Sequence, residues 1–190
     1  VGELAQIEGD IAVYGLDVNN PPSLERFVAD LDGRAIDVLI NNAGIYGPKG
    51  ITAKDVTVED WMPVMQTNIL APLFLARALL DNVAKGERKL IVNISSIMGS
   101  VEKGAAGSEY IYRSSKAALN MVMACYAQEI ADTKVAVVMF HPGWVQTDMG
   151  GKAADITVAQ SAEGLIARID ALEIGRTGCF EAWDGEAIAF

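Results

Sequence analysis

The stretch IDVLINNAG, residues 36–44, decides the fold. It opens with a short apolar run, IDVLI, and not with a strict alternation of apolar and polar residues. Such a run is typical of a parallel strand that is covered on both faces. Two adjacent amides, Asn41 and Asn42, end the run, and burying an amide costs free energy unless it is hydrogen bonded. Residues 36–40 are therefore predicted to form a buried strand that leads into a polar corner.

Apolar runs and helical patterns alternate along the rest of the chain. Strands are predicted at 10–18, 36–40, 89–96, 134–140 and 177–181. Helices are predicted at 23–32, 57–86, 110–131 and 157–172, the first two with Ser23 and Thr57 as N-caps. This alternation predicts an α/β fold with a doubly wound parallel sheet, in a single domain of residues 1–190. Ligands bind such sheets at the carboxyl ends of the strands, where this chain places Asp17, Asn41–Gly44, Ser95–Ser96 and His141–Gly143.

Composition excludes several classes of function. Of the 190 residues, 51% are hydrophobic and 21% charged, which argues against a disordered chain. The formal net charge of −10 repels phosphate backbones, so we expect no nucleic-acid partner. The apolar stretches are too short to span a bilayer, and no secretory signal pattern opens the sequence, so we expect no membrane partner and a cytoplasmic location. One histidine and two distant cysteines predict no metal site.

The segment YRSSK, residues 112–116, carries a candidate acid–base pair. Tyr112 and Lys116 are four residues apart, so on a helix they share one face. A tyrosine has a pKa of about 10, and a nearby ammonium group lowers it toward the range useful for proton transfer. The alternative is an ordinary surface pair on an amphipathic helix. Tyr110 offers no such pair, because Ser114 lies four residues after it.

Two further segments carry polar residues with more than one interpretation. Ser95 and Ser96 end a predicted strand, where a hydroxyl could donate to a carbonyl oxygen or simply satisfy the loop backbone. Pro72 lies inside a helical pattern, has no N–H and crowds the carbonyl four residues before it, which belongs to Asn68. We expect a distorted helix whose Asn68 carbonyl is available to hold a water molecule, with a simple packing kink as the alternative.

The loop HPGWVQTDMGG, residues 141–151, follows a predicted strand. Its Pro-Gly pair indicates a turn. Thr147 and the backbone of this loop could bind the polar edge of a ligand, and an ordinary strand–helix connection is the alternative.

The order of these motifs along the chain resembles the short-chain dehydrogenase/reductase family, and the resemblance covers the whole chain. It rests on NNAG at 41–44, Asn68, Ser95–Ser96, Tyr112 with Lys116, and Pro142–Gly143. Within that family, ISSIMGS, YRSSKAALNM and HPGWVQTDMGG are most similar to C-factor and sniffer-type carbonyl reductases. The resemblance implies a Rossmann-like fold.

The resemblance also implies roles for particular residues. Tyr112 corresponds to the catalytic acid/base, and Lys116 to the residue that lowers its pKa and holds the nicotinamide ribose. Ser96 corresponds to the serine that orients the substrate, with Ser95 as the alternative, and Asn68 to the asparagine of a proton relay. The NNAG amides would tie strand ends together. The implied cofactor-binding residues are Asp17, Val18, Asn41, Ala43, Gly44, Tyr112, Lys116, Pro142, Gly143, Val145 and Thr147.

The implied activity is hydride transfer between a nicotinamide cofactor and a small-molecule carbonyl or alcohol. The cofactor would be NADP or NAD, and the sniffer-like motifs favour NADP. The family further suggests a homodimer or tetramer formed through the predicted helices 57–86 and 110–131.

The chain departs from the family pattern in one respect. The glycine-rich turn Thr-Gly-x-x-x-Gly-x-Gly, which receives the cofactor diphosphate, is not found, and residues 1–10 read like the segment after the family's second strand. We therefore expect the sequence to lack one strand–helix–strand unit of the natural protein. Strand 36–40 would then be an open apolar edge, with strand 10–18 orphaned or paired directly to it. This departure motivates the alternative function, a truncated or non-catalytic binding or signalling protein on the same scaffold.

Overall fold

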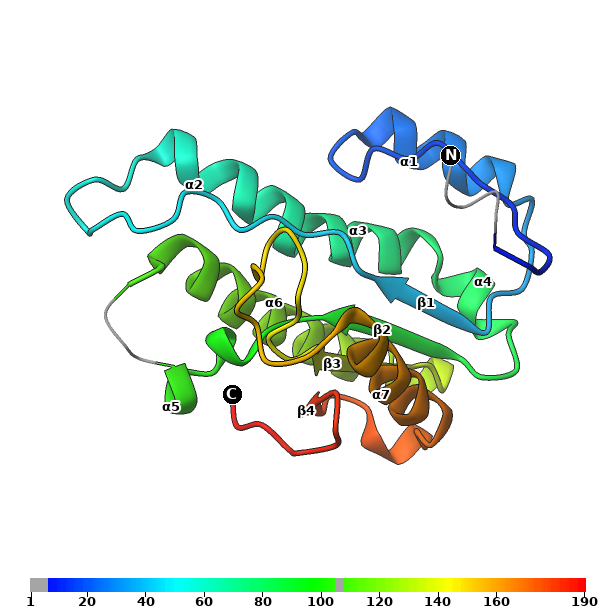
Figure 1. Cartoon of the computed structure of the whole chain (residues 1–190). Helices are drawn as coiled ribbons and strands as arrows, with labels where there is room; N and C mark the ends of the chain where they lie inside the picture. Colours follow the sequence, from blue (N-terminus) through cyan, green and yellow to red (C-terminus); the bar gives the residue numbers. More distant parts are fainter. Residues whose placement is uncertain (1–6, 105–107) are drawn as a thin grey trace.

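A parallel sheet with helices on both faces forms the centre of the computed structural model, which describes residues 7–104 and 108–190 (Figure 1). The strands are β1 (Val38–Asn41), β2 (Leu90–Ile94), β3 (Ala136–His141) and β4 (Phe180–Ala182). They lie in the order β1-β2-β3-β4, and each neighbouring pair is parallel. The predicted α/β class with a doubly wound parallel sheet is confirmed.

Helices connect the strands and cover the sheet. They are α1 (Pro21–Asp30), α2 (Val58–Met65), the π-helical turn η2 (Gln66–Leu70), α3 (Ala71–Ala78), α4 (Leu80–Ala84), α5 (Val101–Gly104), α6 (Tyr110–Glu129) and α7 (Val158–Asp170). Short 3₁₀ turns are η3 (Ile97–Gly99), η4 (Ala131–Thr133) and η5 (Ile174–Arg176). The predicted loop 97–108 is thus partly helical, and its residues 105–107 lie outside the described residues.

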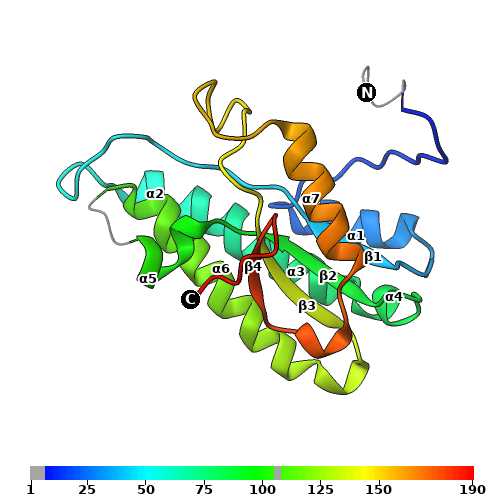
Figure 2. The same cartoon turned by 60° about the horizontal axis from the view of Figure 1, so that its bottom comes forward.

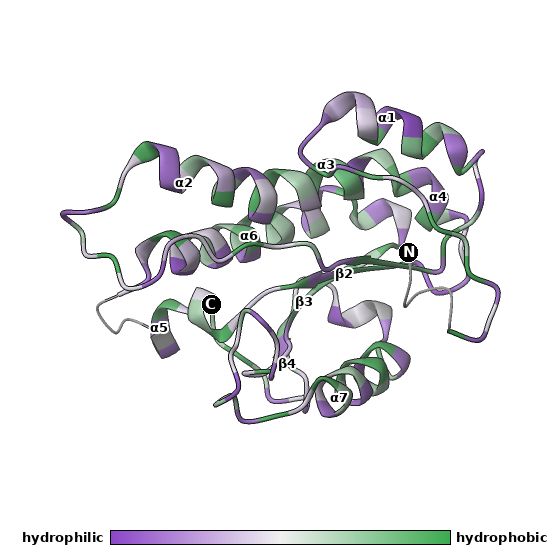
Figure 3. Cartoon of the chain, turned by 45° about the horizontal axis from the view of Figure 1, so that its top comes forward, coloured by the Kyte–Doolittle hydropathy of each residue, from purple (hydrophilic) through white to green (hydrophobic). Residues whose placement is uncertain are grey.

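The two faces of the sheet carry separate cores, because successive strand residues point to opposite sides. Ile91 and Val137 lie in a cluster with residues of α3 and α6, whereas Val92 and Val138 lie in a cluster with Ile169 of α7. Figure 2 shows α7 on the opposite side of β2 and β3 from α6. Hydrophobic and hydrophilic residues are interleaved along α6 and α7, as expected of helices with one buried face (Figure 3).

The predicted helix 57–86 is interrupted, and Pro72 explains where. Thr57 caps α2 as predicted, its side chain accepting a hydrogen bond from the Asp60 N–H at 3.1 Å. The helix widens at η2, where the Ala71 N–H donates to the carbonyl of Gln66, five residues back. Pro72 then follows with no N–H to offer. The predicted helix distortion is confirmed.

The first helix begins earlier than predicted. Asn20, not Ser23, is its N-cap, and the Asn20 side chain accepts a hydrogen bond from the Ser23 N–H at 3.1 Å. Proline suits the first helical position because its missing N–H would be unpaired there anyway, so the helix starts at Pro21.

The predicted strand at residues 10–18 is wrong, since the structure has no strand there. A strand needs a neighbouring backbone to share its hydrogen bonds, and within residues 7–104 and 108–190 no strand pairs with this segment. Its apolar residues pack on helices instead: the Tyr14 ring meets the Phe27 ring of α1 edge-on at 5.6 Å, and Leu16 packs against the cluster of Leu75 and Leu79.

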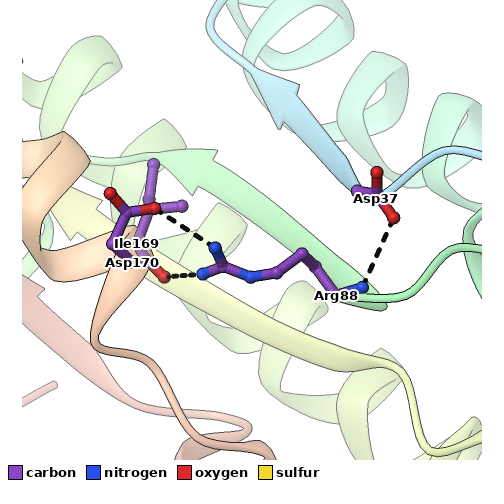
Figure 4. A network of polar contacts seen from close by, with 4 residues as sticks. All are labelled: Asp37, Arg88, Ile169 and Asp170. Carbon is purple, nitrogen blue, oxygen red and sulfur yellow. Dashed lines mark hydrogen bonds and ion pairs between the residues drawn. The ribbon is translucent and has the colours of Figure 1, made fainter.

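Polar contacts hold together the starts of β1 and β2 and the end of α7. The guanidinium of Arg88, just before β2, donates to the Asp170 carboxylate at 3.2 Å and to the Ile169 carbonyl, both at the end of α7 (Figure 4). The Arg88 N–H also contacts the Asp37 carboxylate before β1 at 3.5 Å. These contacts join one edge of the sheet to α7. Among the residues that the structure describes, no helix has both the length and the apolar character needed to cross a membrane.

Candidate active site

Four chain segments meet near the carboxyl ends of β1 and β2. The start of α6 supplies Tyr112 and Lys116, both buried, at 8% and 4% exposure. A side chain at Gly44, after β1, would come within 3.3 Å of the Asn68 amide oxygen and 3.6 Å of the Lys116 ammonium nitrogen. A side chain at Gly99, after β2, would come within 2.7 Å of the Lys116 backbone. The two glycines therefore allow the strand ends to approach Asn68 and α6 closely.

The NNAG corner is held by a ladder of amides that crosses three strands. The Asn41 amide donates to the Asn93 side-chain oxygen of β2 at 2.9 Å, and the Asn93 amide donates to the Val138 carbonyl of β3 at 3.2 Å. Asn41 ties strand ends together as predicted, whereas Asn42 is exposed. Asn93 was not singled out in the sequence, although a lone polar residue inside the apolar run LIVNI was a usable signal.

The serine pair divides into one structural residue and one site residue. The Ser95 hydroxyl donates to the Asn120 side-chain oxygen at 2.6 Å and is buried against α6. The Ser96 hydroxyl accepts a hydrogen bond from the Met98 N–H at 3.2 Å, and its interaction with Tyr112 lowers the pKa of that phenol. Ser96 is therefore the serine that lies beside the tyrosine, and its implied role in orienting the substrate stays a prediction.

The side chain of Asn68 is fully engaged inside the protein. Its oxygen accepts from the Ile45 N–H, and its amide donates to the Ile45 carbonyl and the Ser115 hydroxyl, each at 2.9 Å. Any relay through Asn68 must therefore use its backbone carbonyl, to which Pro72 cannot donate. The expected water on that carbonyl stays a prediction.

Burial dominates the acid–base properties of the pair on α6. Burial raises the pKa of Tyr112 to about 12, the hydrogen bond with Ser96 lowers it in part, and Tyr46 raises it further. Burial lowers the pKa of Lys116 to about 8. The Lys116 ammonium donates to the Ile94 carbonyl at 2.9 Å and lies 5.7 Å from the centre of the Tyr112 ring. Burial is thus the largest effect on the pKa of Tyr112 in this structure, and the expectation that Lys116 lowers that pKa stays a prediction.

Some of the predicted cofactor-binding residues line a common cavity. A cavity of about 200 Å³ lies between residues 16–18 and the end of β1, and Val18, Asn41 and Ala43 line it. Asp17 is exposed beside it, its carboxylate accepting from the Asn19 N–H at 3.0 Å. The small residues Ala43 and Gly44 follow β1 beside this cavity, and a cavity with small residues at its rim fits the ribose of the implied cofactor.

The loop after β3 has a fixed shape of its own. Gly143 has φ of +88°, and a side chain there would lie 2.4 Å from the Ile156 side chain, so only glycine fits. Val145 pairs with Ile156, and the Thr147 hydroxyl accepts from the Gly150 N–H at 3.1 Å. Pro142 accepts at its carbonyl from the Ser161 hydroxyl of α7.

The predicted residues thus form two groups. Across the described part of the chain, no hydrogen bond joins Asp17, Val18 or the loop 142–147 to the cluster of Asn68, Ser96, Tyr112 and Lys116. A larger cavity of about 620 Å³, between α1 and the α2–α3 segment, contains none of that cluster. Its lining is mainly apolar and offers no acid–base pair of the kind found on α6.

One aromatic residue beside the cluster was missed from the sequence. The ring of Tyr46, two residues after the NNAG corner, stacks on the ring of Tyr112 with centres 4.3 Å apart and planes 17° apart. The spacing of the motifs does not predict this contact, because it joins a loop after β1 to the first turn of α6.

Comparisons with known proteins agree along nearly the whole chain. A family model described as short chain dehydrogenase matches residues 1–156. C-signal of Myxococcus xanthus is 34% identical over 165 residues, which cover 87% of this chain and 99% of that protein. The structure of carbonyl reductase Sniffer of D. melanogaster matches with a TM-score of 0.91 at 32% identity, covering 100% of this chain and 82% of that one. NADPH-bound carbonyl reductase from chicken fatty liver has a TM-score of 0.91 at 33% identity, covering 100% and 81%.

Proposed function

This chain belongs to the short-chain dehydrogenase family, as its motifs indicated, and on that premise we propose that it is an NAD(P)-dependent oxidoreductase acting on a carbonyl or alcohol. The observation that carries the proposal is the buried cluster of Asn68, Ser96, Tyr112 and Lys116, in which a serine hydroxyl meets a tyrosine one helical turn from a lysine. The proposal takes residues 1–190 as a single domain that carries both the cofactor site and the catalytic residues.

The chemistry divides between cofactor and protein. A bound nicotinamide supplies the hydride in carbonyl reduction and accepts it in alcohol oxidation. The Ser96 hydroxyl orients the substrate oxygen by hydrogen bonding. Tyr112 gives its proton to that oxygen in reduction and takes one in oxidation. A pKa of about 12 keeps Tyr112 a neutral phenol at neutral pH, which is the form that donates a proton.

The same proposal assigns the cofactor as NADP or NAD, with NADP favoured. Support comes from similar solved structures that contain NADP(H), including a carbonyl reductase from Pseudomonas aeruginosa in complex with NADP at 34% identity. The residues of this chain that would hold the cofactor are Asp17, Val18, Asn41, Ala43, Gly44, Tyr112, Lys116, Pro142, Gly143, Val145 and Thr147. Isothermal titration with NADPH and NADH measures the preference directly.

Turnover of a carbonyl panel with NADPH or NADH tests the activity. Tyr112→Phe should remove the activity, whereas the matched control Tyr110→Phe, two residues away on the same helix and 40% exposed, should keep it. If Tyr112→Phe kept the wild-type turnover, Tyr112 would not be the catalytic acid/base. Absence of turnover by the wild-type chain over the whole panel would count against the enzyme reading itself.

A second function, binding or signalling without catalysis, has one observation in its favour. The relative named C-signal is 34% identical and aligns over 99% of its length. The dinucleotide titration separates the two functions. Tight binding supports the oxidoreductase, and no binding by a folded chain supports the alternative.

The proposal extends to assembly and location. Residues 57–86 and 110–131 form the contacts of a homodimer or tetramer, supported by the exposed apolar side chains of Val58, Met62 and Leu70 on one segment and Met121 on the other. Size-exclusion chromatography with light scattering tests this, and a monomer at assay concentration would reject it. Cell fractionation tests the predicted cytoplasmic location.

A further inference from the structure

The loop between the NNAG corner and α2 places a second tyrosine directly on the proposed catalytic one. Tyr46 stacks on Tyr112 with ring centres 4.3 Å apart and planes nearly parallel, at 17°. Near-parallel contact at this distance restricts tilting and rotation of both rings, because each ring occupies the space into which the other would turn.

The loop that carries Tyr46 is anchored on both sides of it. Before Tyr46, the Ile45 backbone makes two hydrogen bonds with the Asn68 side chain, each at 2.9 Å. After it, the Lys49 ammonium donates to the Met149 carbonyl at 2.9 Å, and the Gly50 N–H donates to the Glu109 carboxylate at 3.3 Å. A loop held at three points keeps its aromatic ring in one place.

The hydroxyl of Tyr46 is held as well as its ring. It donates to the Met98 sulfur at 3.9 Å, and burial together with the neighbouring Glu109 carboxylate raises its pKa. Glu109 has φ of 63°, in the left-handed region, and immediately precedes α6, three residues before Tyr112. A glutamate in this conformation costs free energy, so the surrounding contacts must hold it there. The contact ties Tyr46 to the same helix end that carries Tyr112.

We propose, resting on the proposed oxidoreductase function, that Tyr46 is a positioning residue that holds the Tyr112 ring in its place beside Ser96 and shields it from water. The charged and titratable groups around this stack are Lys116 and Glu109 with Arg113 on or beside α6, and Lys49 on the Tyr46 loop, whose ammonium lies 4.9 Å from the centre of the Tyr46 ring. None of these charged groups stacks on the Tyr112 ring as Tyr46 does.

The experiment compares Tyr46→Ala with Tyr46→Phe. Tyr46→Phe keeps the ring and the stack, and it removes only the hydroxyl contacts. Tyr46→Ala removes the stack, admits water to Tyr112 and should lower kcat about tenfold or more with a smaller change in KM. Tyr46→Phe should restore kcat to near the wild-type value. Tyr110→Ala, an exposed tyrosine two residues before Tyr112, serves as the matched control.

A second readout does not depend on turnover. In protein labelled with ¹³C at the tyrosine phenol carbon, the Tyr112 signal is assigned by its loss in Tyr112→Phe, and its titration reports the pKa of that phenol. Since burial and Tyr46 both raise this pKa, Tyr46→Ala should lower it, while Tyr46→Phe leaves it high.

The outcomes separate this inference from the proposed function. An unchanged Tyr112 titration in a folded Tyr46→Ala variant overturns the positioning role. A shifted titration together with no turnover in wild type supports the positioning role and counts against the oxidoreductase. Circular dichroism melting of each variant establishes that it is folded.

Discussion

The amide of Asn93 is expected to be a main determinant of the stability of the sheet corner. Asn93 is fully buried in the middle of the sheet, where an apolar residue would otherwise be expected. It accepts from Asn41 at 2.9 Å and donates to the Val138 carbonyl at 3.2 Å. The perturbation is Asn93→Ala, which removes both contacts and leaves the buried Asn41 amide with only the Pro72 carbonyl at 3.4 Å.

The magnitude follows from these contacts. Each hydrogen bond contributes about 1 kcal/mol net, and leaving the buried Asn41 amide poorly paired costs about 1 kcal/mol more. Asn93→Ala should therefore lower the free energy of unfolding by about 3 kcal/mol. Asn42→Ala is the control, because it removes a neighbouring amide that is exposed and makes no hydrogen bond among the described residues, and it should cost less than about 0.5 kcal/mol.

Urea unfolding followed by circular dichroism measures both variants, together with Asn41→Ala and the double variant. Since Asn41 and Asn93 share one hydrogen bond, their effects should be non-additive by about 1 kcal/mol. An Asn93→Ala variant as stable as Asn42→Ala, or strict additivity in the cycle, would refute the ladder as the element that holds the strand ends.

Three further predictions concern the site. Gly143→Ala should cost about 1–3 kcal/mol of stability, measured by the urea midpoint, because the new methyl group would lie 2.4 Å from Ile156 at a φ of +88°. Burial lowers the pKa of Lys116 from 10.5 to about 8, so between these pH values the unfolded chain binds more protons than the folded one. The free energy of unfolding should therefore rise with pH across that range. Lys116→Met should flatten this rise, and an unchanged slope in the variant would contradict the prediction. Ser96→Ala should lower kcat by about a hundredfold, whereas Ser95→Ala should mainly lower the melting temperature, because the Ser95 hydroxyl is bound to α6.

Local rules were sufficient for much of the fold. The Thr57 cap depends on two residues three apart, and the widened turn at Gln66–Leu70 depends on a proline that cannot donate. The placement of Tyr112 and Lys116 on one helix face depends only on helical spacing. The parallel sheet follows from apolar runs that alternate with helices. In each case the cause lies within a few residues of its effect.

The predicted strand at 10–18 failed because a strand is defined by its neighbour. The apolar residues of this segment do become partly buried, as Tyr14 and Leu16 pack toward α1 and α3. Their pattern shows that the segment has an apolar side, but it cannot say whether a backbone or a helix will cover that side. The stack of Tyr46 on Tyr112 escaped prediction for a related reason, since it joins residues far apart in the chain.

The acid–base pair shows how one sequence pattern can carry two opposite electrostatic effects. In water, a lysine ammonium group one helical turn from a tyrosine would stabilise the phenolate, so the pKa of the phenol would fall. Here the same spacing places both groups in the interior, where desolvation disfavours both charged forms: the pKa of Tyr112 rises to about 12 and that of Lys116 falls to about 8. The sign is decided by what covers the pair, namely Tyr46, the strand ends and the turn after β2. Residues that contact Tyr112 from outside its own helix are therefore the ones whose substitution should change its proton affinity most.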